Sequence, residues 1–279
     1  MTSTTTPAAS TQHEVWNELV GDAWVRHAAI HDRHAEPFGD VVLAAVGSVE
    51  GAAVLDVGCG TGALSGELAT RGAREVLGVD ISRPMIEAAR AANEQPMVRF
   101  ELADAASLDD PARYDAIVSR FGVMFFDDPT ATFTHLRTLG APKARLGFCC
   151  WGPPGDNPWM VVPVMATVPV LGPPRFAGPD EPGPFSLASP EKVQRILDAS
   201  GWKDVGITEL ALDLPHPAGD ADAVAQVIVE FSPPIAEGLR RLPHRADDAR
   251  AAVAEALRPL ERDGTVHLGA CAQIVTARR

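Results

Sequence analysis

The sequence predicts an α/β fold with a doubly wound, mostly parallel sheet, and two observations carry this prediction. Short apolar segments rich in Val, Ile and Leu alternate with segments of helical periodicity from residue 52 onward. The first apolar segment, 52–57, leads into Gly58, Gly60 and Gly62 and then into a helix. Such a turn leaves backbone N–H groups pointing toward a ligand. We therefore expect the binding site at the carboxyl ends of the strands.

The individual elements follow from apolar periodicity and from helix start and stop signals. Thr11 and Glu14 have the spacing of a capping box, and the N-terminal helices are expected at about 23–35 and 38–48. Strands are expected at 52–57, 75–79, 98–102, 114–119, 145–151, 205–214 and 265–277, the last of them antiparallel. Further helices are expected at 63–70, 83–92, 130–139, 190–200, 221–231, 234–242 and 246–262.

The segment 152–184 differs in composition from the rest, because Pro and Gly dominate it and large apolar residues stand between them. A flexible linker would not need these apolar residues, so we interpret the segment as a lid. The chain is interpreted as a single domain. Its parts are an N-terminal helical cap (1–47), a ligand-binding core (48–151), the lid (152–188) and the remaining sheet with a helical insertion (189–279).

Charge and composition exclude several classes of partner. The net charge of −13 argues against a nucleic-acid partner, which would require a basic face. No apolar run has the length of a membrane span and no signal-peptide pattern is visible, so we expect a cytoplasmic protein without a membrane partner. The four cysteines lack metal-ligand spacing, and no metal is expected. The sequence leaves the oligomeric state open.

Acidic residues near the glycine turn narrow the class of ligand. The turn also fits the dinucleotide spacing G-x-G-x-x-G, since Ala63 is a permitted substitute for the last glycine. Asp56, just before the glycines, favours instead a ligand with a cationic end. Asp80 follows the second strand, where nucleotide-binding α/β folds place a carboxylate that accepts from ribose hydroxyls.

Two motifs resemble those of class I methyltransferases that use S-adenosylmethionine (SAM). They are Val54-Leu-Asp-Val-Gly-Cys-Gly-Thr-Gly62 and Gly78-Val-Asp-Ile-Ser82, and the resemblance extends from about Trp16 to Trp159. It implies a seven-stranded Rossmann-like sheet of order 3-2-1-4-5-7-6, with SAM as cofactor and S-adenosylhomocysteine as product. It also implies that Asp104 accepts from the adenine amino group. The cofactor-binding residues so expected are Asp56, Gly58, Cys59, Gly60, Thr61, Asp80, Ile81, Asp104, Ala105, Ser119 and Arg120.

The segment that should face the transferred methyl group is Ser119-Arg-Phe-Gly-Val-Met-Phe-Phe126. It lacks the [Asn/Asp]-Pro-Pro-[Tyr/Phe] pattern of enzymes that methylate base or amide nitrogens. It resembles instead small-molecule enzymes akin to the ubiquinone and menaquinone methyltransferases. A flat aromatic or apolar acceptor is favoured by the expected pocket residues, although core packing is the alternative for some: Trp24, Phe121, Met124, Trp151 and Trp159.

Three histidines recur at helical spacing near the N-terminus. His27, His31 and His34 lie on one face with Trp24, or nearly so. One interpretation is a partly solvated helix face on which the histidines have no function. The other is acid–base catalysis, because imidazole has a suitable pKa for proton transfer. His31, central in the stripe, is the first candidate for a catalytic base, with His27 and His34 as alternatives.

These observations together predict transfer of a methyl group from SAM to carbon, nitrogen or oxygen of a small acceptor, in secondary metabolism or quinone-like biosynthesis. Two other functions stay open. One is a SAM-binding protein that catalyses a non-methylating reaction. The other is an NAD-dependent oxidoreductase, which would leave Asp56 and Asp104 unexplained.

Overall fold

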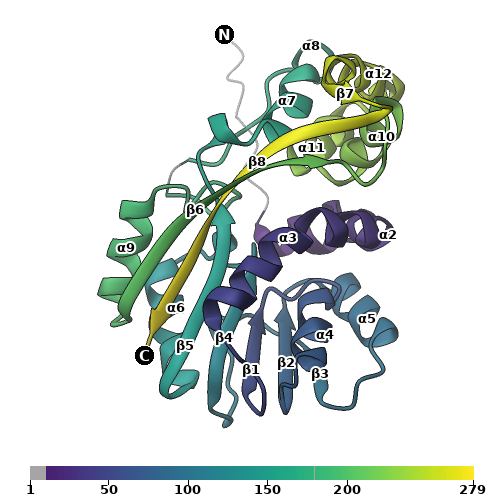
Figure 1. Ribbon diagram of the computed structural model, residues 1–279. Coiled ribbons are helices and arrows are strands. Elements are labelled where there is room, and N and C mark those ends of the chain that lie inside the picture. Colours follow the sequence, from purple (N-terminus) through teal and green to yellow (C-terminus); the bar gives the residue numbers. More distant parts are fainter. Residues whose placement is uncertain (1–10, 179) are drawn as a thin grey trace.

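A twisted sheet forms the central layer of the protein (Figure 1). The computed structural model describes residues 11–178 and 180–279. Within this part of the chain the strand order is β3-β2-β1-β4-β5-β8-β6, and the short β7 pairs with β8. Neighbouring strands from β3 to β5 run parallel, whereas β8 is antiparallel to β5 and β6. The predicted strand order and the antiparallel last strand are confirmed. The strands are β1 Ala53–Val57, β2 Glu75–Asp80, β3 Val98–Leu102, β4 Tyr114–Arg120, β5 Gly140–Trp151, β6 Lys203–Pro215, β7 Glu261–Arg262 and β8 Thr265–Arg278.

The helices that connect the strands cover the sheet. All five residues of β1 are buried, which explains why it is a continuous apolar run apart from Asp56. Helix α4 contacts β2, α5 contacts β3, α9 contacts β6, and α6 packs against α9. These helices keep close to their predicted bounds: α4 Ala63–Thr70, α5 Arg83–Ala92, α6 Pro129–Leu139 and α9 Pro190–Ala199.

The N-terminal helices lie between the carboxyl ends of the strands and a group of helices above them (Figure 1). They comprise α1 (Gln12–Glu14), a π-helical turn η1 (Val15–Leu19), α2 (Gly21–Arg26) and α3 (Ala28–Val46). The capping box of Thr11 and Glu14 is present.

Their boundaries differ from the prediction, because the break falls at His27 and α3 continues through Pro37. Phe38, Val42 and Val46, spaced four residues apart, are buried on one side of α3. This packing outweighs the hydrogen bond that Pro37 cannot make.

A second group of helices, here called the helical lobe, is inserted between β6 and β8 and is joined by helices of the predicted lid. Its apolar cluster contains Val164 and Leu171 together with Val224, Ile228 and Leu257. The first half of the predicted lid is therefore partly packed in a core. The short helix that the sequence allows at 159–168 is present as α7, and a second short helix, α8, follows it. The members are α7 (Pro158–Ala166), α8 (Val168–Leu171), α10 (Ala221–Phe231), α11 (Pro233–Arg241) and α12 (Ala246–Leu257).

Short helical turns complete the structure. The helix expected at 246–262 ends at Leu257 and is followed by the 3-10 turn η5 (Arg258–Leu260), because Pro259 interrupts helical hydrogen bonding. Three other turns of this kind are η2 (Val123–Phe125), η3 (Pro154–Asp156) and η4 (Pro243–Arg245). Across the described ranges, every helix is too short or too polar to cross a membrane.

Candidate active site

The glycine turn after β1 is shaped by contacts within the protein. Gly58 has a φ of +67°, and a Cβ there would lie 2.7 Å from the Cα of Gly122. The N–H groups of Gly58 and Cys59 both donate to the carbonyl oxygen of Val79. Cys59 is itself buried. A side chain at Gly58 would collide with the backbone of Gly122. The glycine therefore permits close packing of two loops.

Asp56 lies beneath this turn and has no exposed surface. Its Oδ2 accepts a hydrogen bond of 2.6 Å from the hydroxyl of Ser65, and its Oδ1 has no partner among the described residues. Burial raises the pKa of Asp56 to about 6. The expectation that Asp56 meets a cationic ligand at the mouth of the site is wrong for this conformation, because its carboxyl group is sealed inside the fold.

Asp80, at the end of β2, is placed as predicted beside the glycine turn. Its Oδ2 accepts from the N–H of Gly60 at 2.9 Å and its Oδ1 from the N–H of Ser82 at 2.8 Å. Burial raises the pKa of the Asp80 carboxyl, although these backbone hydrogen bonds act against the shift. The neighbouring Ile81 is half-buried, and its carbonyl oxygen accepts from the side chain of Asn17.

Asp104 follows β3 on the same edge of the sheet. It is exposed, and its Oδ1 accepts from the N–H of Ala106 at 2.8 Å, which fixes the turn. Ala105 is buried. The N–H of Ala103 donates to the carbonyl oxygen of Asp80 at 3.0 Å. The structure therefore brings the loops of Asp80 and Asp104 together, as the sequence predicts.

Ser119 and Arg120 end β4, but only Arg120 has a polar group directed at the site. The Ser119 hydroxyl donates to the carbonyl oxygen of Val57 at 2.7 Å and accepts from the N–H of Gly122 at 3.1 Å. Ser119 is buried, so the structure assigns it to joining β1 and β4 instead of binding a cofactor.

Arg120 forms an ion pair with Asp32 of α3, with an N···O distance of 2.5 Å. The other oxygen of Asp32 accepts from the hydroxyl of Thr61 in the glycine turn at 3.3 Å. Asp32 thus connects the N-terminal layer to two loops of the site. Sequence reasoning missed it, since an acid beside His31 on a polar helix face carries no signal of its own.

Aromatic rings line the ends of β4 and β5. Phe121, which has an unusual φ of +63°, stacks on Trp151 at a centroid distance of 3.7 Å. Trp159 of α7 lies 4.9 Å from Trp151. A bulky residue held in the left-handed region is strained, and such strain concentrates at functional sites. The structure therefore brings together three predicted pocket residues, Phe121, Trp151 and Trp159, here called the aromatic wall.

The other two predicted pocket residues lie elsewhere. Met124 is buried, and its sulfur accepts from the N–H of Trp151 at 3.3 Å, so it supports the aromatic wall from the core. Trp24 belongs to a second aromatic group, where it stacks on His31 at 4.1 Å and meets Phe231 and Trp16 edge-on.

The three histidines of the stripe have different surroundings. His27 is half-buried, and its Nε2 is 3.0 Å from the carboxylate of Glu230. His31 lies between Trp24 and Phe231, and its Nε2 is buried without a partner among the described residues. Burial is the main cause that lowers the pKa of His31 to about 3. Such a low pKa makes His31 neutral at pH 7.

His34, one turn further along α3, faces a different set of rings. Its ring centroid is 5.5 Å from Trp159 and 5.5 Å from His216, which follows β6. Burial lowers the pKa of His34 to about 4 and that of His216 to about 3. Sequence reasoning did not find His216, because nothing in a loop far along the chain indicates that it reaches α3.

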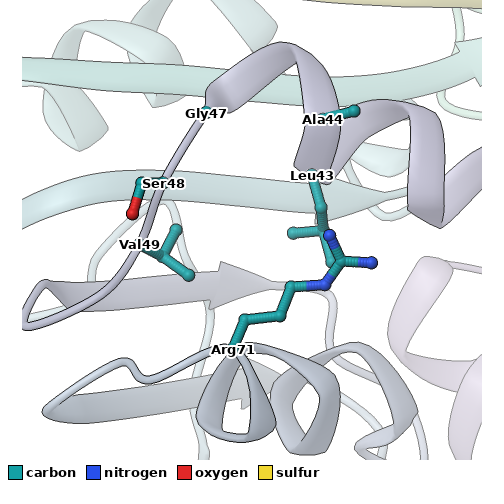
Figure 2. A pocket seen from close by; sticks show the side chains of 6 residues that line it. All are labelled: Leu43, Ala44, Gly47, Ser48, Val49 and Arg71. Atoms are coloured by element: carbon teal, nitrogen blue, oxygen red, sulfur yellow. The ribbon is translucent and has the colours of Figure 1, made fainter.

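A surface hollow of about 460 Å³ lies away from these residues (Figure 2). Arg71 at the end of α4 and Ser48 ahead of β1 are among its lining residues. It is found beside the amino ends of the strands, whereas the glycine turn and Asp80 follow their carboxyl ends. Ligands of open α/β sheets bind at the carboxyl ends, so the hollow is not the candidate site.

Comparisons with known proteins agree with the fold and the motifs. Residues 54–143 match the family described as methyltransferase domain. An uncharacterised protein of Mycobacterium tuberculosis is 30% identical over 148 residues, which make up 51% of each chain. The ubiquinone biosynthesis O-methyltransferase of Leptothrix cholodnii is 40% identical over 102 residues, 35% of this chain and 43% of that one.

The structure of the (4+2)-cyclase SpnF has the same fold, with a TM-score of 0.54 and 20% identity over 98% of this chain and 97% of that one. The match spans about half the length of the Mycobacterium tuberculosis protein, 51% of that chain. The resemblance indicated by the motifs is confirmed: residues 54–143 match the methyltransferase domain family, and the sheet has the strand order that this resemblance implies.

Proposed function

We propose that the protein transfers a methyl group from SAM to a small aromatic acceptor. The observation that carries this proposal is the order of groups along one edge of the sheet. The glycine turn, Asp80 and Asp104 follow β1, β2 and β3, while Phe121 and Trp151 lie at the ends of β4 and β5. A nucleoside-binding half and an aromatic half are therefore adjacent, as methyl transfer between two bound molecules requires.

The residues around Asp80 fit the nucleoside part of SAM. A Cβ on Gly60 would meet nothing closer than the sulfur of Met85 at 3.8 Å, so this part of the turn is open. Each carboxylate oxygen of Asp80 accepts one backbone N–H and retains a lone pair for a further hydrogen bond. Asp80 can therefore accept from the ribose hydroxyls without giving up its contacts to the loops, and the exposed Asp104 is available to the adenine amino group.

The Asp32–Arg120 ion pair fits the amino-acid end of SAM, which carries an ammonium and a carboxylate. Both side chains are partly exposed, at 31% and 15%, and Thr61 of the glycine turn adjoins them. When SAM binds, Asp32 would pair with its ammonium and Arg120 with its carboxylate, in place of their contact with each other. Every charge would stay paired, which limits the cost of desolvation. Asp32 thereby takes the role that the sequence assigned to Asp56.

The chemistry requires little from the protein beyond positioning, because the sulfonium of SAM already activates the methyl carbon. The rings of Phe121, Trp151 and Trp159 would hold a flat acceptor and exclude water. A neutral imidazole would receive the proton of an oxygen or nitrogen nucleophile. His34 lies against Trp159, whereas His31, the first candidate from the sequence, lies in the other aromatic group between Trp24 and Phe231. A carbon nucleophile would lose its proton after attack, so the proposal covers transfer to carbon, nitrogen or oxygen.

Calorimetry with SAM, S-adenosylhomocysteine and NAD tests the cofactor, and incubation with methyl-labelled SAM and a panel of phenols, enols and indoles tests the transfer. We expect both adenosyl compounds to bind, NAD not to bind, and label to appear on an aromatic acceptor. Binding of NAD alone would contradict the proposal. Tight SAM binding without label transfer to any acceptor would favour a non-methylating reaction, the alternative with which the fold likeness to the cyclase SpnF is compatible.

A further inference from the structure

Two buried histidines from distant parts of the chain meet at the far end of the aromatic wall. His34 comes from α3 and His216 from the residue after β6, and their ring centroids are 5.5 Å apart at an interplanar angle of 40°. Their exposed fractions are 9% and 7%. Neither histidine is needed to bind SAM in the function proposed above.

The hydrogen-bonding capacity of His34 is unused. Both of its ring nitrogens are buried and have no partner among the described residues, so no hydrogen bond joins it to His216. A buried polar group without a partner lowers the stability of the fold, and native proteins seldom retain one without a function. We therefore expect an atom of a bound molecule to form a hydrogen bond with His34.

The proton of His216 has a defined place. Its Nδ1 accepts a hydrogen bond of 3.2 Å from the N–H of Ala218. A neutral imidazole whose Nδ1 accepts must carry its proton on Nε2, so His216 presents a donor. His34 can present an acceptor, a donor, or both. One oxygen atom can satisfy the two rings if it accepts from His216 and, as a hydroxyl, donates to His34.

The pair also defines the charge of its ligand. Burial keeps both imidazoles neutral at pH 7, so they provide no positive charge for a carboxylate or a phosphate. A neutral hydroxyl or carbonyl group matches them better, because it forms hydrogen bonds without bringing an unpaired charge into the interior.

A row of ring contacts connects the pair to the place of methyl transfer. His34 lies 5.5 Å from Trp159, Trp159 lies 4.9 Å from Trp151, and Trp151 stacks on Phe121 at 3.7 Å. Phe121 directly follows Arg120 of the cofactor half. An aromatic molecule anchored by an oxygen at the histidines would therefore extend along the indoles toward the transferred methyl group.

We propose that His34 and His216 bind an oxygen of the acceptor and thereby select a neutral, oxygen-bearing aromatic molecule. The proposal rests on the function proposed above and extends it to the class of acceptor. In it both residues position the acceptor and determine specificity, whichever group receives the proton.

The test is calorimetry of the protein saturated with S-adenosylhomocysteine, titrated with 2-naphthol and with 2-methoxynaphthalene, which lacks the O–H donor. We expect the wild type to bind 2-naphthol roughly tenfold more tightly, as one or two neutral hydrogen bonds would provide. His34→Phe should bind the two probes with nearly equal affinity, because the O–H group that only 2-naphthol carries donates to His34. His216→Phe should keep a preference for 2-naphthol but bind both probes more weakly, because the oxygen of each probe accepts from His216. His244→Phe, at an exposed position, is the matched control and should keep the wild-type preference.

Retention of the tenfold preference in His34→Phe would overturn the proposal, and so would unchanged affinity of His216→Phe for both probes or a wild type that does not prefer 2-naphthol. Because S-adenosylhomocysteine binding is measured first, its failure would instead contradict the proposed function. If either Phe variant does not fold, ¹⁵N-histidine spectra of the wild type decide: 2-naphthol should shift the resonances of His34 and His216 and leave those of His244 in place. Unshifted His34 and His216 resonances would overturn the proposal.

Discussion

The buried histidines should make the stability of the protein strongly dependent on pH. Burial lowers the pKa values of His31, His34 and His216 to about 3, 4 and 3, whereas an unfolded histidine has a pKa of 6.5. A depressed pKa in the folded state means that the unfolded chain binds more protons below pH 6.5. The stability that neutral imidazoles contribute is therefore complete above that pH and is lost as the pH falls.

The size of this effect follows from linkage. Between pH 7.5 and pH 5.5, protonation of the unfolded state costs about 1.4 kcal/mol for each imidazole that stays neutral in the fold, or about 4 kcal/mol for the three. Asp56, whose pKa is raised to about 6, opposes this by taking up a proton in the folded state. Its contribution over the same interval is about 0.8 kcal/mol. The four groups together should destabilise the fold by about 3 kcal/mol.

Urea unfolding at the two pH values measures the effect, and a variant isolates one histidine. His31→Gln changes the free energy of unfolding at every pH. The decrease in this free energy between pH 7.5 and pH 5.5 should, however, be about 1.4 kcal/mol smaller in the variant than in the wild type. The exposed His244→Gln should leave that loss unchanged. If the wild type and His31→Gln lose the same free energy of unfolding over this interval, His31 is not a buried neutral group and the reasoning fails.

Three further predictions concern the site itself. Asp80→Ala should weaken SAM binding by about 2–3 kcal/mol, because charge-assisted hydrogen bonds to the ribose are lost; calorimetry showing unchanged affinity would remove Asp80 from the site. Gly58→Ala should lower the free energy of unfolding by at least about 1 kcal/mol, since its Cβ meets Gly122, whereas Ala at the open Gly51 should cost less in the same urea titration. If His31 is the base, His31→Ala should lower kcat about 10²–10⁴-fold with SAM affinity preserved, and the acidic limb of the wild-type pH–rate profile should lie near pH 3; a variant with wild-type kcat would exclude this role.

Much of the sheet could be predicted because its sequence signals are local. The run 52–57 and the alternation in 265–277 specify β1 and β8 within a residue or two, and Asp80 and Asp104 follow strands whose ends are well marked. Since parallel strands share one carboxyl edge, strand ends alone placed the glycine turn and these two acids together.

The remainder depends on contacts between residues far apart in the sequence. Asp56 and Ser119 match cofactor motifs, but their side chains bond to Ser65 and Val57 inside the fold. His216 reaches His34 only because the end of β6 and α3, which are far apart in the sequence, come together in the fold. Periodicity along one helix placed His31 and His34 on a common face, yet it could not show that they enter different aromatic groups.

The long ladder of β6 and β8 has a consequence for how such a protein can be altered. Pro215 pairs with His267, so the chain leaves the sheet and re-enters it at neighbouring positions, with α10, α11 and α12 in between. These helices therefore form an insertion whose two ends are held together by the pairing of β6 with β8. Exchange of residues 217–264 for a different insertion would leave the residues of the glycine turn, Asp80 and the Asp32–Arg120 pair in the chain. It would replace Phe231 and Glu230, the neighbours of His31 and His27, and the helix α12, on which α7 packs.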